Sequence, residues 1–354
     1  MKNQKINNFN FIIQKKFFVF DLVSEIENLF IKSRNIEIDR PIFICGMPRS
    51  GTTFLLNLIN NSNQVSSCTY GQLPFFKTPL TWSFFKKFYY FGNQKFARLH
   101  DDGLQIDIDS PDAFEELIWA EVLEKYNEFG FCRFLDKTYS NHKLKKKLYF
   151  FIKKIIFINK KERYLSKGNY NVFRLNYIVN LFKDCKIILC YRNPSNTACS
   201  SERVHNRFLD LSEKIDGFNE NLYFLSHFEF GKNRKALRIE NNSFKISKNL
   251  FEENKNYEGY LHQWISLYQM ILQKYLSNQI FSNNLILLNY DKFILDLEEN
   301  TKKLFSFCEL DFHKSVVKNV NLFKKQDYDA KDSEYNYIAD SLYNKLKCNE
   351  FNFL

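Results

Sequence analysis

The segment Gly46–Thr53, with the sequence GMPRSGTT, combines two glycines, three hydroxyl side chains and one cation. A glycine-bounded loop that leads into a helix presents backbone N–H groups and a helix N-terminus, and both bind phosphate. A nucleotide-hydrolysing loop carries lysine directly after its second glycine. Here Thr52 has that position, and the cation stands earlier, at Arg49. We therefore expect this phosphate loop to hold a phosphate without ATP hydrolysis, through Arg49, Ser50, Gly51, Thr52 and Thr53.

A second pair of anion-binding side chains stands later in the chain. Arg192 follows the apolar segment 187–191, and Ser200 lies eight residues further on, in the helix expected after Pro194. A guanidinium makes two parallel hydrogen bonds to a phosphate, and a hydroxyl adds a third donor. Arg192 and Ser200 are therefore expected to converge on one anion.

The surrounding pattern predicts the elements that position these residues. Apolar segments expected as strands lie at 41–45, 65–69, 187–191 and 285–288, and helical patterns lie at 54–59, 172–182 and 296–308. Strands that alternate with helices indicate an α/β fold, with a mostly parallel central sheet, helices on both faces and helical insertions. Ligands bind at the carboxyl ends of such strands, where Arg49 and Arg192 both fall.

We expect one large domain with an extra segment at each end and an insertion within it. We expect a helical lead-in at 1–39, an α/β domain at 40–325 and a tail or helix at 326–354. Within the domain, residues 70–165 are expected to form a lid or insertion. Ser110 as N-cap and Pro111 at the first helical position predict a helix from 112 to 128 inside this insertion.

Composition excludes some function classes. The eight cysteines form no CxxC pair and the six histidines are scattered, so we expect reduced thiols, a cytoplasmic protein and no metal. The net charge of +11 suits an anionic ligand or surface. No apolar stretch reaches the ~20 residues that cross a bilayer. The lysine-rich segment 143–163 fits either peripheral contact with anionic lipid or a solvated helix face. We expect no nucleic-acid partner.

These motifs resemble those of the sulfotransferases that use 3′-phosphoadenosine 5′-phosphosulfate. In that family a loop of the type Pro-Arg/Lys-Ser-Gly-Thr-Thr holds the 5′-phosphosulfate, and arginine occurs there in carbohydrate- and peptide-directed branches. A later strand-end Arg-(Asp/Asn)-Pro, with serine eight residues on, holds the 3′-phosphate. This chain has both motifs in order, at Pro48–Thr53 and at Arg192–Ser200. Further similarity at Tyr164–Lys167 and Asn289–Phe293 extends the resemblance over residues 40–325.

The resemblance implies a P-loop sulfotransferase that moves a sulfuryl group to a hydroxyl or amine of an unidentified acceptor, such as a carbohydrate or a lipid. Arg49 would stabilise charge on the departing phosphate. A general base must take the acceptor proton. Family branches use histidine or glutamate, so the candidates are Glu115, Glu116 and His100, with Glu115 preferred.

Two other functions remain open at this stage. One is a nucleotide or small-molecule kinase with an atypical phosphate loop, although Thr52 in place of lysine argues against it. The other is a non-catalytic nucleotide- or glycan-binding relative, against which the intact donor motifs argue. Affinity for adenosine 3′,5′-bisphosphate, compared with ATP and magnesium, separates the kinase from the transferase.

Overall fold

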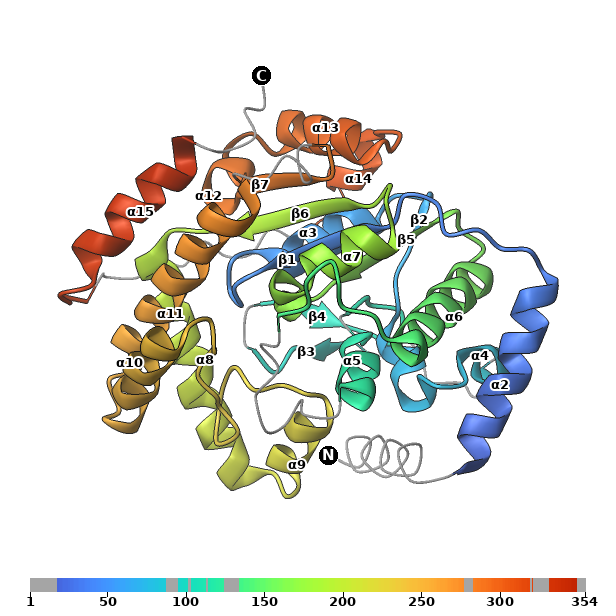
Figure 1. Cartoon of the computed structure of the whole chain (residues 1–354), viewed down its shortest axis with the longest axis horizontal. Helices are drawn as coiled ribbons and strands as arrows, with labels where there is room; N and C mark the ends of the chain where they lie inside the picture. The colour runs from blue at the N-terminus through green and yellow to red at the C-terminus, as the bar shows by residue number, and fades with distance from the viewer. Residues whose placement is uncertain are drawn as a thin grey trace.

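A five-stranded parallel sheet forms the centre of the molecule (Figure 1). The computed structural model describes residues 18–86, 95–100, 103–112, 114–123, 134–276, 283–318, 320 and 331–348. The strand order is β2-β5-β1-β6-β7, and each neighbouring pair is parallel. The strands are β1 (Ile42–Gly46), β2 (Val65–Ser66), β5 (Arg163–Lys167), β6 (Lys186–Tyr191) and β7 (Leu285–Asn289). A separate antiparallel pair joins β3 (Phe96–Ala97) to β4 (Gln105–Ile106).

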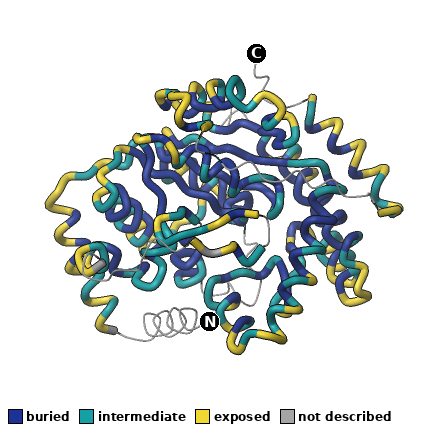
Figure 2. The backbone as a smooth tube through the Cα atoms, turned by 180° about the vertical axis from the view of Figure 1, so that it is seen from behind, coloured by how far each residue is buried: buried dark blue, intermediate teal, exposed yellow. Residues whose placement is uncertain are grey.

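Helices cover both faces of the sheet, as the sequence predicted. Side chains alternate between the faces of a strand, so Ile42 and Ile44 of β1 pack in one apolar cluster while Phe43 and Cys45 pack in another. The first cluster includes residues of α3 (Thr52–Asn60), α12 (Tyr290–Phe293), α13 (Leu297–Cys308) and α14 (Lys314–Lys318). The second includes residues of α5 (Glu116–Val122), α6 (His142–Asn159), α7 (Leu175–Leu181), α8 (Pro194–Lys214), α9 (Phe218–Phe224), α10 (Asn241–Glu252), α11 (Asn256–Ile271) and α15 (Asn336–Cys348). Figure 2 shows the buried strands between these layers.

The other helical segments lie around these layers. They are α2 (Phe18–Ser33), α4 (Pro79–Lys86), the 3-10 turns η1 (Tyr70–Phe75), η2 (Asn169–Phe173) and η5 (Ile294–Asp296), and a π-helical turn, η3 (Leu272–Leu276). None of the helices within the described ranges is long and apolar enough to cross a membrane. Most of the lysine-rich segment 143–163 lies in α6, and the tail or helix expected at 326–354 contains α15.

Strand β5 lies beside β1 at the centre of the sheet, although its sequence RYLSK lacks an apolar run. Arg163 is buried, and its guanidinium donates hydrogen bonds to the carbonyl oxygens of Arg40, Cys308 and Glu309. A buried charge is tolerated when its donors are satisfied. These backbone carbonyls, from just before β1 and from the end of α13, therefore explain a strand that apolar periodicity does not predict.

The predicted helix start at Ser110 is wrong. Helix α5 begins at Glu116, and Pro111 instead forms an isolated β-bridge with Thr69. The hydroxyl of Ser110 accepts a hydrogen bond from the N–H of Asp107 at 2.9 Å, so it caps a turn rather than a helix. Serine and proline favour turns as well as helix starts, and pairing with residue 69 selects the turn. Residues 124–128 of the predicted helix lie outside the described residues.

Candidate functional site

The phosphate loop has a backbone conformation that leaves no room for extra side chains at two positions. Gly46 has φ +143°, and a Cβ there would lie 2.2 Å from the carbonyl oxygen of Cys190. Gly51 has φ +98°, and a Cβ there would lie 2.2 Å from the ring of Tyr290. Arg49 also has a positive φ of 71°. A non-glycine residue in this region costs ~1–3 kcal/mol, and such strain concentrates at functional sites.

Buried hydrogen bonds fix the loop to the neighbouring strand. The hydroxyl of Tyr268, on α11, accepts from the N–H of Met47 at 3.3 Å and donates to the carbonyl oxygen of Cys190 at 2.7 Å. The thiol of Cys190 donates to the carbonyl oxygen of Ser50. Burial raises the pKa values of Tyr268 and Cys190, so both groups stay protonated as donors. The loop is therefore held rigidly at the carboxyl ends of β1 and β6.

The two motifs found in the sequence meet in space. The Nε of Arg49 donates a hydrogen bond to the hydroxyl oxygen of Ser200 at 3.0 Å, and Ser200 is 1% exposed on α8. At the start of α3, the hydroxyl of Thr52 donates to the side-chain oxygen of Asn169 at 3.3 Å. The structure thus brings the phosphate loop against the helix that follows Arg192.

Arg192 lies at the end of β6 and is oriented by α12. Its Nε lies 3.2 Å from a carboxylate oxygen of Asp291, whose other oxygen accepts the N–H of Asn193 at 2.7 Å. The guanidinium also lies over the ring of Tyr290, 5.6 Å from its centroid. Burial raises the pKa of Tyr290 to about 12, while the charges of Arg192 and Arg49 act in the opposite direction. Tyr290 is therefore close to both cations, and it also contacts the loop near Gly51.

Glu115 and Glu116 lie at the start of α5, and both are buried rather than exposed. Glu115 accepts hydrogen bonds from the Tyr164 hydroxyl at 2.7 Å and from the Asn171 amide at 3.1 Å. Burial raises the pKa of Glu115, and these hydrogen bonds partly oppose that effect. Glu116 pairs with both terminal nitrogens of Arg174, at 2.8 and 2.7 Å. Both carboxylates thus bind side chains from β5 and the segment that follows it.

His100 has a different environment. Its ring packs against Phe208 with centroids 5.2 Å apart, and its Nδ1 is buried with no hydrogen-bond partner among the described residues. Burial, followed by the charges of Arg98 and Arg49, holds the pKa of His100 well below its ordinary value. The imidazole is therefore neutral at pH 7, and it is close enough to Arg49 to feel its charge.

A charged cluster beside the site was not predicted from the sequence. Asp112 accepts a hydrogen bond from the Tyr70 hydroxyl at 2.6 Å and from Lys167 at 3.3 Å, and Arg98 lies 3.8 Å away. Lys167 ends β5, next to the phosphate-loop strand β1. These residues come from four separate segments, so no local pattern could have grouped them. The described residues contain no cluster of three or more His, Cys, Asp or Glu arranged to hold a metal.

Comparison with solved structures supports the fold. The structure of the sulfotransferase STF1 from Mycobacterium tuberculosis H37Rv is similar, with a TM-score of 0.51 and 10% identity over 84% of this chain and 75% of that one. The sulfotransferase STF9 from Mycobacterium avium gives a TM-score of 0.49 and 12% identity over 82% of this chain and 70% of that one. At such identities the STF1 likeness supports a shared fold. No curated protein sequence matches the chain.

The family itself is identified by sequence. The sequence model of the Sulfotransferase family matches residues 41–220, which make up just over half of the chain. The matched span begins at the strand before the phosphate loop and continues through Arg192 and Ser200. Together with the parallel sheet and the meeting of the two motifs, this match shows that the chain belongs to the sulfotransferase family.

Proposed function

We propose that this sulfotransferase uses 3′-phosphoadenosine 5′-phosphosulfate as donor and transfers its sulfuryl group to a hydroxyl or amine of an acceptor. The observation that carries the proposal is the 3.0 Å contact between Arg49 Nε and Ser200 Oγ. A donor with phosphate groups at both ends of its ribose needs two anion-binding motifs close together. This contact supports one continuous site built from both motifs.

The residues present fit such a donor. The phosphate loop approaches β6 and Tyr290 so closely that side chains at Gly46 and Gly51 are excluded. Glycine-bounded loops of this type bind anions through backbone N–H groups. Ser50, Thr52 and Thr53 add hydroxyl groups to this cradle. Arg192 and Ser200 would hold the 3′-phosphate, and the carboxylate of Asp291 keeps the guanidinium in position.

The bound donor supplies an activated sulfuryl group with a phosphate as leaving group. Arg49 would stabilise the charge that develops on that phosphate, which is the largest single contribution in many group transfers. Its left-handed backbone and its contact with Ser200 hold the guanidinium in one place before the reaction. Preorganised cations of this kind need no rearrangement as charge develops.

We assign the general base to His100 in preference to Glu115 or Glu116. A base must reach the acceptor proton and must be unprotonated. His100 is neutral and is influenced by the charge of Arg49, and its Nδ1 is buried and without a partner among the described residues. Glu115 and Glu116 are engaged by Tyr164, Asn171 and Arg174. These two carboxylates are better suited to hold α5 against the segment after β5.

Ligand titration tests the donor assignment. The purified chain is titrated with adenosine 3′,5′-bisphosphate and, separately, with ATP and magnesium. The proposal expects clear preference for the bisphosphate, and preference for ATP would support a kinase instead. Mass spectrometry of carbohydrate and lipid fractions incubated with donor then looks for a sulfated product. Tight bisphosphate binding with no transfer to any hydroxyl or amine would favour a non-catalytic binding protein.

A further inference from the structure

Helix α2 buries two polar side chains beside Ile31 and exposes several apolar ones. Glu27 and Asn28 are only 5% and 8% exposed, whereas Leu22, Ile26 and Leu29 are 54%, 59% and 70% exposed. A surface helix normally buries its apolar stripe and exposes its charges. The exposed side chains are three and four residues apart, so they form one continuous stripe along the helix.

Buried ionic contacts hold α2 in this orientation. Lys154 of α6 lies 3.1 Å from the carboxylate of Glu27, and both side chains are at most 5% exposed. The other carboxylate oxygen of Glu27 accepts the N–H of Thr81 at 2.6 Å, and Lys154 also donates to the hydroxyl of Ser24 at 3.1 Å. Rotation of α2 to bury its leucines would leave Lys154 and Glu27 without these partners, which is costly in the interior. The apolar stripe is therefore fixed outward.

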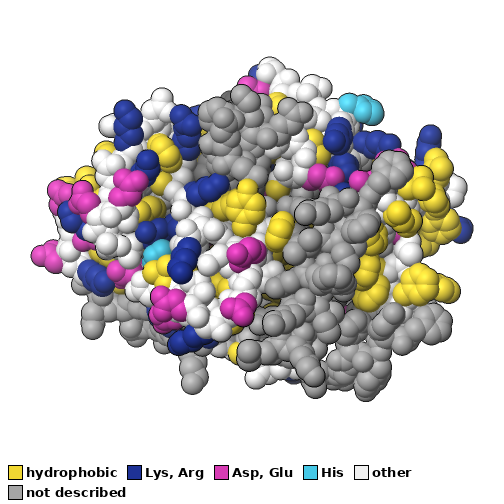
Figure 3. Space-filling model, turned by 90° about the horizontal axis from the view of Figure 1, so that it is seen from below, with side chains coloured by type: hydrophobic (Ala, Val, Ile, Leu, Met, Phe, Trp, Pro, Cys, Tyr) yellow, Lys and Arg dark blue, Asp and Glu magenta, His cyan; other side chains and the backbone are white. Residues whose placement is uncertain are grey.

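Neighbouring aromatic residues extend the stripe into a wider surface. Phe30 packs on Phe157 of α6 with ring centroids 5.6 Å apart, and Phe84 of α4 is 63% exposed. A groove of about 1330 Å³ runs between these helices. We call Leu22, Ile26, Leu29, Phe30 and Phe84 the docking face. Figure 3 shows hydrophobic side chains gathered at the right-hand end of the molecule, the end at which α2 lies in Figure 1.

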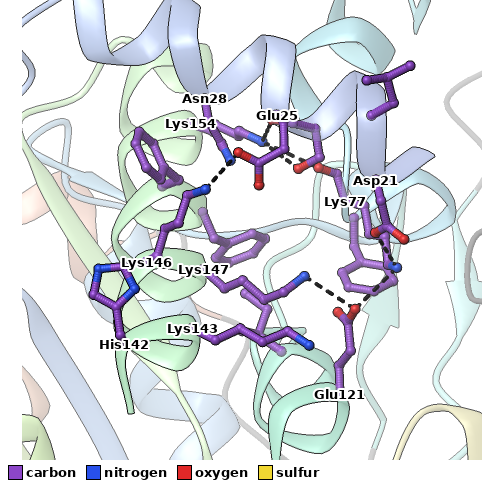
Figure 4. Close-up of a pocket in the computed structure, with 16 residues that line it drawn as sticks. Asp21, Glu25, Asn28, Lys77, Glu121, His142, Lys143, Lys146, Lys147 and Lys154 are labelled. Carbon is purple, nitrogen blue, oxygen red and sulfur yellow. Dashed lines mark hydrogen bonds and ion pairs between the residues drawn. The ribbon is translucent and has the colours of Figure 1, made fainter. Parts of the chain in front are cut away.

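The charge around the docking face is positive. Residues 142–161 contain eight lysines and no acidic residue, and Lys160 and Lys161 line the groove together with Glu37 and Glu162. The acidic residues of α2 are already paired with lysines, Asp21 with Lys77 and Glu25 with Lys146, each at 2.8 Å (Figure 4). At the end of α2, the guanidinium of Arg34 lies over the ring of Phe30. An exposed apolar face bordered by excess lysine and arginine is the composition that binds anionic bilayers.

We propose that the docking face places this protein on the surface of an anionic lipid bilayer. The exposed leucine, isoleucine and phenylalanine side chains enter the interface, and exposed lysines beside the face, such as Lys160, contact lipid phosphates. A second copy of the chain is a poorer occupant, because a net charge of +11 repels another copy. In Figure 1, α2 lies at the opposite end of the molecule from α8, which carries Ser200. Docking therefore leaves the donor site uncovered.

Vesicle flotation of the full chain tests this inference. We expect binding to vesicles with about 30% phosphatidylserine in phosphatidylcholine and about tenfold weaker binding to phosphatidylcholine alone, since each basic residue near such a surface contributes favourably. The double substitution Leu22→Ser and Ile26→Ser is expected to weaken binding to the anionic vesicles by about tenfold or more. The matched control is Leu295→Ser, because Leu295 is 83% exposed on η5, away from the face, and should leave binding unchanged.

Several outcomes would overturn the inference. The inference is wrong if the parent chain does not bind anionic vesicles. It is also wrong if high salt removes the binding while the Leu22→Ser, Ile26→Ser variant binds as tightly as the parent chain. Light scattering that shows a dimer of the parent chain and a monomer of that variant would assign the face to a second copy. Thermal unfolding of each variant checks that the fold is intact. None of these measurements needs donor or turnover, so the result is independent of the proposed reaction.

Discussion

The guanidinium of Arg49 contacts the hydroxyl of Ser200 at 3.0 Å, although 151 residues separate them in the chain. The contact joins the loop after β1 to the helix after β6, and these two strands are neighbours in the sheet. Parallel pairing places both strand ends at one edge, and ligands bind at that edge in folds of this type. The site is therefore a consequence of the strand order.

Replacement of Arg49 should affect turnover more than donor binding. We expect Arg49→Ala to lower kcat by about 10²–10³-fold, the range seen when one preorganised charge-stabilising donor is removed. Arg49→Lys keeps the charge but lacks the Nε that bonds Ser200, so its kcat should lie between those of the parent and the alanine variant. Initial rates at saturating donor measure both. An alanine variant with parental kcat would remove Arg49 from the reaction.

Arg192 should determine recognition of the 3′-phosphate. A hydrogen bond to a charged group contributes about 1.5–3 kcal/mol, so Arg192→Ala should weaken adenosine 3′,5′-bisphosphate by about ten- to a hundredfold. Affinity for adenosine 5′-phosphate, which lacks the 3′ group, should change little. Isothermal titration with both nucleotides gives the comparison. Lys292→Ala is the control, because it removes an exposed cation beside Asp291. Equal losses for the two nucleotides would contradict the assignment.

His100 and Glu115 can be separated by turnover and stability. We expect His100→Gln to lower kcat by about 10²–10⁴-fold while the bisphosphate affinity is kept. Glu115→Gln should retain turnover and lower the melting temperature, because it disturbs the buried contacts with Tyr164 and Asn171. The low pKa of His100 also predicts that kcat/KM stays constant as the pH falls to values below ~6.5, the ordinary histidine pKa. Loss of turnover in the Glu115 variant alone would make that carboxylate the base.

Much of the central sheet could be predicted because its strands are apolar runs that end in recognisable residues. Strand β6 and Arg192 are an example, since a buried parallel strand needs apolar side chains on both faces. Strand β5 could not be predicted in this way. Its first residue, Arg163, is stabilised by carbonyl oxygens from distant segments, and a local pattern carries no information about them.

The site was predicted only where its residues form local motifs. Arg49, Ser200 and Arg192 belong to such motifs, and the structure places Arg49 Nε 3.0 Å from the Ser200 hydroxyl, a contact that the motifs alone did not predict. Asp112 was interpreted as part of a helix start, but its partners Tyr70, Lys167 and Arg98 come from other segments. Asp291 likewise acts on Arg192 from α12, 99 residues later in the chain. Contacts of this kind depend on the fold and become visible only in three dimensions.

Acid sensitivity of the fold should depend in part on His205. Its Nδ1 accepts the N–H of Gly231 at 3.0 Å, and burial lowers the pKa of His205 to about 4. An unfolded histidine has a pKa of about 6.5, so between these values the unfolded state binds the proton and the folded state does not. The free energy of unfolding must therefore decrease as the pH falls through this window, and above it the contribution vanishes.

The expected size of this loss of stability, and the control variant for it, both follow from the contact between His205 and Gly231. At about pH 5 the contribution of His205 should be about 1–2 kcal/mol, after allowance for solvent screening. His205→Asn keeps an acceptor for the N–H of Gly231 but does not titrate, so its stability should decrease less than that of the parent between about pH 7.5 and pH 5. Urea unfolding at the two pH values measures both decreases. If the two proteins lose equal stability, the acid sensitivity arises at other groups, such as His262, whose pKa is also lowered by burial.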